Sequence, residues 1–149
     1  MPGKISDYTF SNELRKQTEL MDFLSDVRNI INSFMTGVVA KVESTGQTGD
    51  IATTTIYTPT TAWAFRISIY MICTTAGTGT LSCTIGWQDA SGAKTLSPAG
   101  TVDLSNTANG STGTAFIRAN ASAITYATAI AGKAGSPEYT IHIILEQMG

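Results

Sequence analysis

The sequence predicts a mainly β protein, an antiparallel β-sandwich or jelly roll with an N-terminal amphipathic α-helix. Three observations lead to this fold class. Apolar and polar residues alternate with a period of two in several segments after Gly46, as in strands with one buried face. Turn-forming residues separate these segments at short intervals. Residues 1–43 carry 11 of the 20 charged side chains. The chain therefore divides into a charged helical segment for attachment or oligomerisation, residues 1–43, and a weakly charged β-sandwich domain, residues 44–149.

Length and charge exclude several classes of protein. A chain of 149 residues with 42% hydrophobic residues can form a substantial core. Its net charge of −2 gives no electrostatic reason to bind nucleic acid or an anionic membrane. No apolar run approaches the roughly 18 residues of a membrane span, and the N-terminus lacks the apolar core of a secretory signal. We therefore expect synthesis in a cytoplasm, with no nucleic-acid or membrane partner.

The N-terminal segment predicts a helix from about residue 12, capped by Thr9 or Ser11 and ended by Gly37. Its apolar residues follow gaps of 4, 3, 4, 3 and 4, the spacing of one buried helix face. Phe23 and Ile30 widen this face. We call the following six residues the helical seam: Leu20, Leu24, Val27, Ile31, Phe34 and Val38. The seam must be buried on the chain's own β domain, on further copies of the chain, or on a neighbouring protein.

Seven or eight strands are expected in the β domain, with no crossover helix between them. In the last one, Tyr139, Ile141 and Ile143 share the core face, and His142 lies on the opposite face. This arrangement predicts an antiparallel sandwich or jelly roll, with an up-and-down barrel as the alternative. The segments are DIATTTIYT (50–58), WAFRISIYMICT (63–74), TLSCTIGWQDA (80–90), TVDLS (101–105), TGTAFIRA (112–119), AITYATAI (123–130) and EYTIHIILEQM (138–148), with VVAKVE (38–43) as a further short strand.

The stretch MICTTAGTGTLSCTIGW, residues 71–87, is interpreted as a hairpin. Folding about Thr78 places Cys73 opposite Cys83, with the glycines in the loop. A phosphate loop would need a Gly-Lys-Ser/Thr ending before a helix. Two cysteines and the lone His142 cannot supply four zinc ligands, and the cysteine spacing is not that of a redox pair. We expect two buried thiols, or alternatively a disulfide formed outside a reducing compartment, and neither a metal nor a cofactor.

No catalytic signature is present. His142 is the single histidine, no nucleophile elbow accompanies it, and the acidic residues of the β domain are scattered. We therefore expect no enzymatic activity. Trp63 and Trp87 are expected in the core. The tyrosines expected to be partly exposed, where they could stack on a sugar ring, are Tyr57, Tyr70 and Tyr126.

Residues 50–149 resemble the small head-decoration, head-fibre and tail-fibre modules of tailed bacteriophages. The resemblance lies in IATTTIYTPTTAWAFRISIYMICTTAGTGTLSCTIGWQDASGAKT and GSPEYTIHIILEQ. Where those modules have a WTD-like motif, this chain has WQDA. These motifs are compositional, so no functional residue is transferred.

The resemblance implies a structural virion component made in a host cytoplasm. It would be a capsid-decoration or head-fibre protein that forms a homotrimer and binds other virion proteins, such as the major capsid protein, through its N-terminal helix. The alternative is a tail-fibre or receptor-binding module that recognises host glycans.

Overall fold

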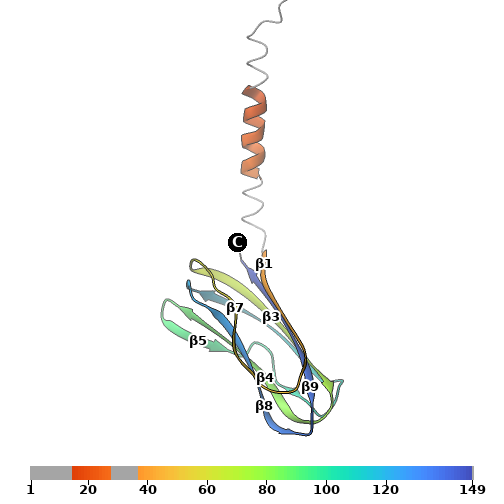
Figure 1. Cartoon of the computed structure of the whole chain (residues 1–149). Coiled ribbons are helices and arrows are strands. Elements are labelled where there is room, and N and C mark those ends of the chain that lie inside the picture. Colours follow the sequence, from red (N-terminus) through yellow and green to blue (C-terminus); the bar gives the residue numbers. More distant parts are fainter. Residues whose placement is uncertain (1–14, 28–36, 149) are drawn as a thin grey trace, which may run out of the picture. The chain divides into compact units, whose positions relative to one another are not determined.

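The computed structural model describes residues 15–27 and 37–148, which belong to two separate units (Figure 1). Residues 15–27 form an α-helix. Residues 37–148 form the β unit. The strands of the β unit are β1 (Gly37–Gln47), β2 (Ile51–Tyr57), β3 (Trp63–Thr75), β4 (Thr78–Asp89), β5 (Gly92–Leu96), β6 (Val102–Asp103), β7 (Gly110–Ala119), β8 (Ile124–Ala134) and β9 (Glu138–Gln147).

The strands of the β unit form two antiparallel sheets (Figure 1). The first has the order β1-β9-β3-β7, and the second has the order β2-β8-β4-β5, with the short β6 also paired to β4. Apart from β6, the pairing is nested: β1 pairs with β9, β2 with β8, β3 with β7, and β4 with β5. Nested antiparallel pairs shared between two sheets define a jelly roll. The predicted sandwich is therefore confirmed, and the alternative of an up-and-down barrel is not what forms.

The core lies between the two sheets and is built by the alternation that the sequence displays. In β3 and β9, every second side chain points inward, and the inward residues are almost completely buried. β4 supplies the facing residues from the second sheet. The most buried large side chains include Phe65, Ile67, Met71, Leu81, Ile85, Tyr139, Ile141, Ile143 and Leu145. These residues all belong to the β unit, so this unit has a core of its own.

The predicted hairpin between Cys73 and Cys83 is wrong. Strands β3 and β4 are consecutive in the chain but belong to opposite sheets. Cys73 is paired with Tyr139, and Cys83 is paired with Thr128. Period-two alternation shows which face of a strand is buried, and that face is the same whether the next strand lies beside it or across the core. The nested order of the whole jelly roll decides between the two.

Three further positions differ from the sequence-based expectation. Val38, the last residue of the helical seam, lies in β1, because backbone pairing with β9 extends back to Gly37. Residues 37–43 of the N-terminal segment are therefore strand. Trp63, expected in the core, begins β3 and is 40% exposed. Tyr126, expected at the surface, is 4% exposed because it points into the sandwich from β8.

Candidate functional site

Outward-facing side chains of the β1-β9-β3-β7 sheet form a regular grid, because backbone pairing fixes the register of the strands. Each strand has every second side chain on this outer face. Strand β1 adds Glu43 next to His142 and Lys41 next to Ile144. The rows of the grid across β9, β3 and β7 are His142–Tyr70–Thr112, Ile144–Ser68–Thr114 and Glu146–Arg66–Phe116.

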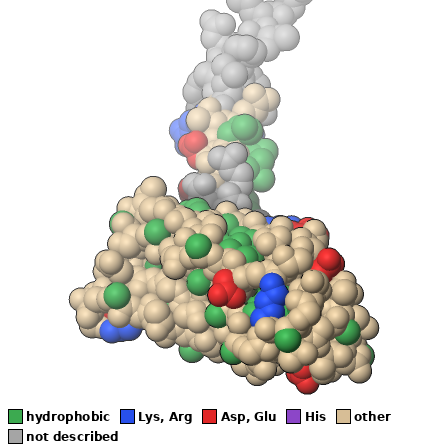
Figure 2. Space-filling view, turned by 60° about the horizontal axis from the view of Figure 1, so that its bottom comes forward, with side chains coloured by type: hydrophobic (Ala, Val, Ile, Leu, Met, Phe, Trp, Pro, Cys, Tyr) green, Lys and Arg blue, Asp and Glu red, His purple; other side chains and the backbone are tan. Residues whose placement is uncertain are grey.

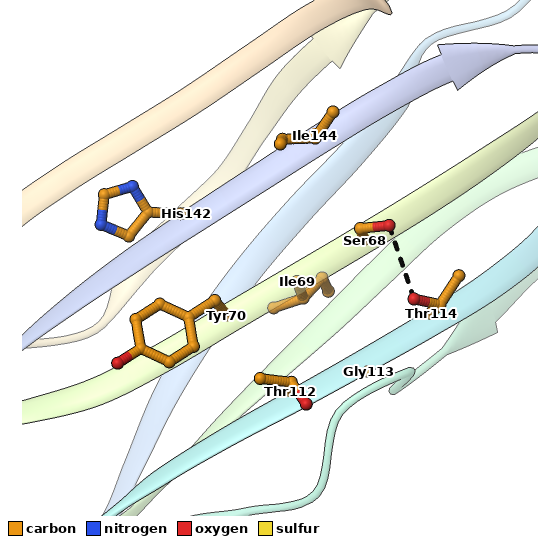
Figure 3. Close-up of a pocket in the computed structure, with 8 residues that line it drawn as sticks. All are labelled: Ser68, Ile69, Tyr70, Thr112, Gly113, Thr114, His142 and Ile144. Carbon is orange, nitrogen blue, oxygen red and sulfur yellow. Dashed lines mark hydrogen bonds between the residues drawn. The ribbon is translucent and has the colours of Figure 1, made fainter. Parts of the chain in front are cut away.

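A hollow of about 500 Å³ opens at the centre of this grid (Figure 3). Ser68 occupies the central position and has a short side chain, whereas Tyr70, Arg66 and Ile144 beside it are long. The hydroxyl groups of Ser68 and Thr114 lie 3.4 Å apart, which is long for a bond between two hydroxyls. We call this the Ser68 hollow; it is lined by Ser68, Ile69, Tyr70, Thr112, Gly113, Thr114, His142 and Ile144.

Two rings stand side by side at one end of the Ser68 hollow. Tyr70 of β3 and His142 of β9 have ring centroids 6.0 Å apart, with planes inclined by 31° (Figure 3). The His142 Nδ1 atom lies 4.0 Å from Oε1 of Glu43 on β1. Tyr70 is 40% exposed, so part of its ring is accessible from solvent. The hollow therefore has an aromatic end, and its surface is mostly apolar, with the hydroxyl groups of Ser68, Thr112 and Thr114 among the residues that line it.

The row of the grid next to the hollow contains an ion pair. The Arg66 Nε donates a hydrogen bond of 2.6 Å to Oε2 of Glu146. This bond and the positive charge of Arg66 lower the pKa of the Glu146 carboxyl below its ordinary value. The two charges neutralise each other, and among the described residues none that lines the hollow is a lysine, an arginine or an acid.

Uncharged atoms also dominate the face of the β unit drawn in Figure 2, where a few blue and red side chains are scattered among tan and green ones. Exposed apolar side chains are present on the outer face of the first sheet. Phe116 is 69% exposed and Val38 is 49% exposed, whereas Ile144 beside the hollow is 38% exposed. The β unit therefore presents a surface of low charge, as its composition indicated.

The helical seam, predicted as a partner interface, is described only in part. Leu20 and Leu24 lie in the helix of residues 15–27 and are 56% and 50% exposed, and Val27 is partly buried. Ile31 and Phe34 lie outside the described residues. Val38 lies in β1, as stated above. Two further apolar residues of the helix, Met21 and Phe23, are 66% and 62% exposed. The described part of this helix thus presents several large apolar side chains to solvent.

Both cysteines are buried free thiols, as expected for the first of the two alternatives. The Cys73 Sγ lies 3.4 Å from the Thr75 carbonyl oxygen and 3.5 Å from the Leu104 carbonyl oxygen, to which it can donate. Burial raises the pKa of the Cys73 thiol, and it raises the pKa of the Cys83 thiol to about 11. Thiols that stay protonated are poor nucleophiles and poor metal ligands.

Residues 15–27 and 37–148 provide neither the side-chain cluster of a metal site nor a helix that could span a membrane. These residues contain no group of three or more His, Cys, Asp or Glu side chains that could hold a metal ion. No helix within these residues is both long enough and apolar enough to cross a membrane.

Sequence reasoning placed Ser68, Tyr70 and His142 on the outer face, and the structure confirms their orientation. The sequence did not predict that these three residues lie close together, and it did not identify Thr112 and Thr114 as their neighbours. The alternating polar residues of each strand were the available signal. Their assembly into one hollow depends on β3 lying between β9 and β7, which the sequence does not display.

Comparison with solved structures finds similar folds in proteins of different kinds. A chain from the capsid of Helicobacter pylori bacteriophage KHP30 is 15% identical, with 76% of this chain and 94% of that chain covered and a TM-score of 0.45. PRD1 vertex protein P5 is 13% identical, with coverages of 76% and 99% and a TM-score of 0.47. The CBM22-1–GH10 modules of Clostridium thermocellum xylanase 10B are 11% identical, with coverages of 78% and 26% and a TM-score of 0.41.

No protein-family model matches the chain. No curated protein sequence matches it either. Capsid proteins and a polysaccharide-degrading enzyme are both found among the similar structures, and one fold can support unrelated functions. Structural similarity at these scores and identities therefore does not assign an activity to this chain.

Proposed function

We propose that this protein is a structural component of a bacteriophage virion, a capsid-decoration or head-fibre protein that assembles through its N-terminal helix. The observation that carries the proposal is the exposure of two leucines of the helical seam. Leu20 and Leu24 are at least half exposed in the single chain, at positions that repeat with heptad spacing. The role is adhesion by buried surface and requires no catalytic turnover.

Heptad spacing favours further copies of the same helix as the occupant of the seam. A helix with one apolar face gains stability when that face is buried. Gaps of 4 and 3 residues keep the face aligned with a partner helix in a coiled coil. Copies related by rotational symmetry bury identical faces together. We infer a homotrimer, the state that the resemblance to phage modules implies, in which the seams of three chains meet.

The β unit suits the projecting part of such an assembly. It has its own jelly-roll core, so it does not need the helix to bury its large apolar residues. Residues 44–149 carry only nine of the 20 charged side chains of the chain. The virion setting itself rests on the resemblance of residues 50–149 to phage modules, and the major capsid protein is the proposed attachment partner.

Self-association can be tested with a charge placed on or beside the seam. In Leu24→Asp, each copy brings a carboxylate into the buried helix face. Ser25→Asp is the matched control, since it adds the same charge one residue further along and off the seam. Native mass spectrometry should show a trimer for the wild type and for Ser25→Asp, and a monomer for Leu24→Asp.

The β unit should melt at the same temperature in all three proteins, because none of the described helix residues, 15–27, belongs to its core. A monomeric wild type, or a Leu24→Asp variant of unchanged mass, would contradict self-association through the seam. Immunogold labelling of intact particles tests the setting. Label over the capsid supports decoration, whereas label at the tail supports the tail-fibre alternative.

A further inference from the structure

We propose that the Ser68 hollow is a binding site for a neutral carbohydrate. A sugar ring would pack on Tyr70, and its hydroxyl groups would form hydrogen bonds with Ser68, Thr112 and Thr114. This inference goes beyond the assembly role and does not depend on the helical seam. It rests on the shape of the hollow, on the chemistry of its lining and on its lack of charge.

The hollow is open to solvent and large enough to hold a small ligand. A volume of about 500 Å³ lies within the usual range for ligand sites, roughly 300–1,000 Å³. Stable protein interfaces need about 800 Å² on each partner, with an apolar centre. The centre of this face is instead Ser68, flanked by Thr114. The exposed apolar residues Phe116 and Val38 lie in the row beyond the hollow.

The lining offers two kinds of contact that a sugar requires. The accessible part of the Tyr70 ring provides an apolar face on which the C–H groups of a pyranose can pack. Hydroxyl groups on Ser68, Thr112 and Thr114 can each donate and accept hydrogen bonds, and His142 adds ring nitrogens beside Tyr70 (Figure 3). The Ser68–Thr114 contact of 3.4 Å is long, so exchanging it for bonds to a ligand hydroxyl costs little.

The charged side chains around the Ser68 hollow restrict the class of ligand that it can bind. Lysine and arginine are the side chains that bind phosphate groups and carboxylates most strongly, and neither is among the described residues that line the hollow. Arg66, in the next row, is already bonded to Glu146. The acid beside the aromatic end is Glu43, 4.0 Å from His142, and it disfavours an anion there. A neutral, hydroxyl-rich ligand is the class that matches these groups.

The site is also pre-organised. The strand that carries Ser68 and Tyr70 is hydrogen-bonded on both sides, to β9 and to β7. Side chains mounted on a central strand need little ordering when a ligand binds, which favours affinity. The backbone positions of Ser68 and Tyr70 are therefore fixed by strand pairing before a ligand arrives.

The test uses the full chain and an array of neutral and sialylated oligosaccharides, followed by calorimetric titration with any neutral oligosaccharide that binds. In Ser68→Gln, a long side chain fills the hollow. Ser82→Gln is the matched control, because Ser82 lies on the second sheet in β4. Tyr70→Ala removes the stacking ring. We expect binding to be lost in Ser68→Gln, weakened about tenfold or more in Tyr70→Ala, and unchanged in Ser82→Gln.

Thermal unfolding checks that each variant is folded, and if Tyr70→Ala does not fold, Ser68→Gln decides the outcome. The proposal is overturned if no neutral oligosaccharide binds at millimolar concentration, if only sialylated ones bind, or if binding survives in Ser68→Gln. A change of oligomeric mass in Ser68→Gln would also overturn it, by showing that this face contacts another chain. None of these results bears on the seam, which Leu24→Asp tests separately.

Discussion

Replacing Tyr139 with Phe should destabilise the β unit by about 2 kcal/mol, because it breaks a chain of hydrogen bonds between the two sheets. The Tyr139 hydroxyl on β9 donates to the Gly49 carbonyl at 2.8 Å. It has a single proton, so the 2.6 Å contact with Thr128 on β8 must be donated by the threonine. The Thr128 oxygen in turn accepts from the backbone N–H of Ile51 at 2.9 Å.

The expected loss of unfolding free energy follows from the hydrogen bonds that Gly49 and Thr128 lose. Phenylalanine keeps the ring packing, so the loss is confined to two hydrogen bonds, each worth about 1 kcal/mol. Gly49 is partly buried and can regain water, whereas Thr128 is 4% exposed and keeps an unused donor. Burial raises the pKa of the Tyr139 hydroxyl, so it remains a donor at neutral pH. A loss of about 2 kcal/mol corresponds to a fall in Tm of roughly 8 °C for a domain of this size.

Urea unfolding, followed by tryptophan fluorescence, measures the loss. Tyr57→Phe is the control, because it also removes a phenol hydroxyl but lies outside the chain of bonds; its ring packs on Phe65 at 5.9 Å. We expect it to change the unfolding free energy by less than about 0.5 kcal/mol. Combining Tyr139→Phe with Thr128→Val should cost clearly less than the sum of the two single changes. Full additivity, or a Tyr139→Phe effect below about 0.5 kcal/mol, would refute the reasoning.

Two further predictions concern the first sheet. Because bonding to Arg66 lowers the pKa of Glu146 below 4.5, its contribution to stability is present above that pH and is lost as the pH falls. Glu146→Gln should therefore be less stable at pH 7 and lose less stability between pH 5 and 3 in acid titrations; an unchanged acid profile would contradict this. A Cβ on Gly113 would lie 2.1 Å from the Pro98 carbonyl oxygen, so Gly113→Ala should cost roughly 3 kcal/mol. Gly100→Ala, whose Cβ would meet only the Ser111 hydroxyl at 3.4 Å, is the control, and equal urea midpoints for the two variants would exclude the close approach.

The sequence correctly predicted which side chains of β3 and β9 are buried and which face outward. The alternation in residues 63–74 and 138–148 identified the buried face of β3 and β9, and the polar positions Ser68, Tyr70 and His142 were assigned to the outer face. The short strand at residues 38–43 was also anticipated and forms part of β1. These assignments succeed because the direction of a side chain in a strand depends only on its parity.

Three predictions made from local sequence patterns were wrong. Cys73 and Cys83 were placed in one hairpin, although their strands lie in opposite sheets. Trp63 was placed in the core by parity, but it begins its strand and is partly exposed. Val38 matched a helical spacing, yet pairing with β9 places it in a strand. For the cysteines and for Val38, pairing between strands distant in sequence outweighed the local pattern, whereas Trp63 is exposed at the end of its strand.

The sequence by itself determined the β class of the larger part of the chain and the buried faces of β3, β4 and β9, because these follow from local periodicity and composition. Only the tertiary structure decided the nested order of strands, and with it the grid that brings Ser68, Tyr70, Thr114 and His142 around one hollow. The physical reason is that strand order is set by backbone hydrogen bonds between residues far apart in the chain, whose donors and acceptors are the same in almost every residue and therefore leave no pattern in the sequence.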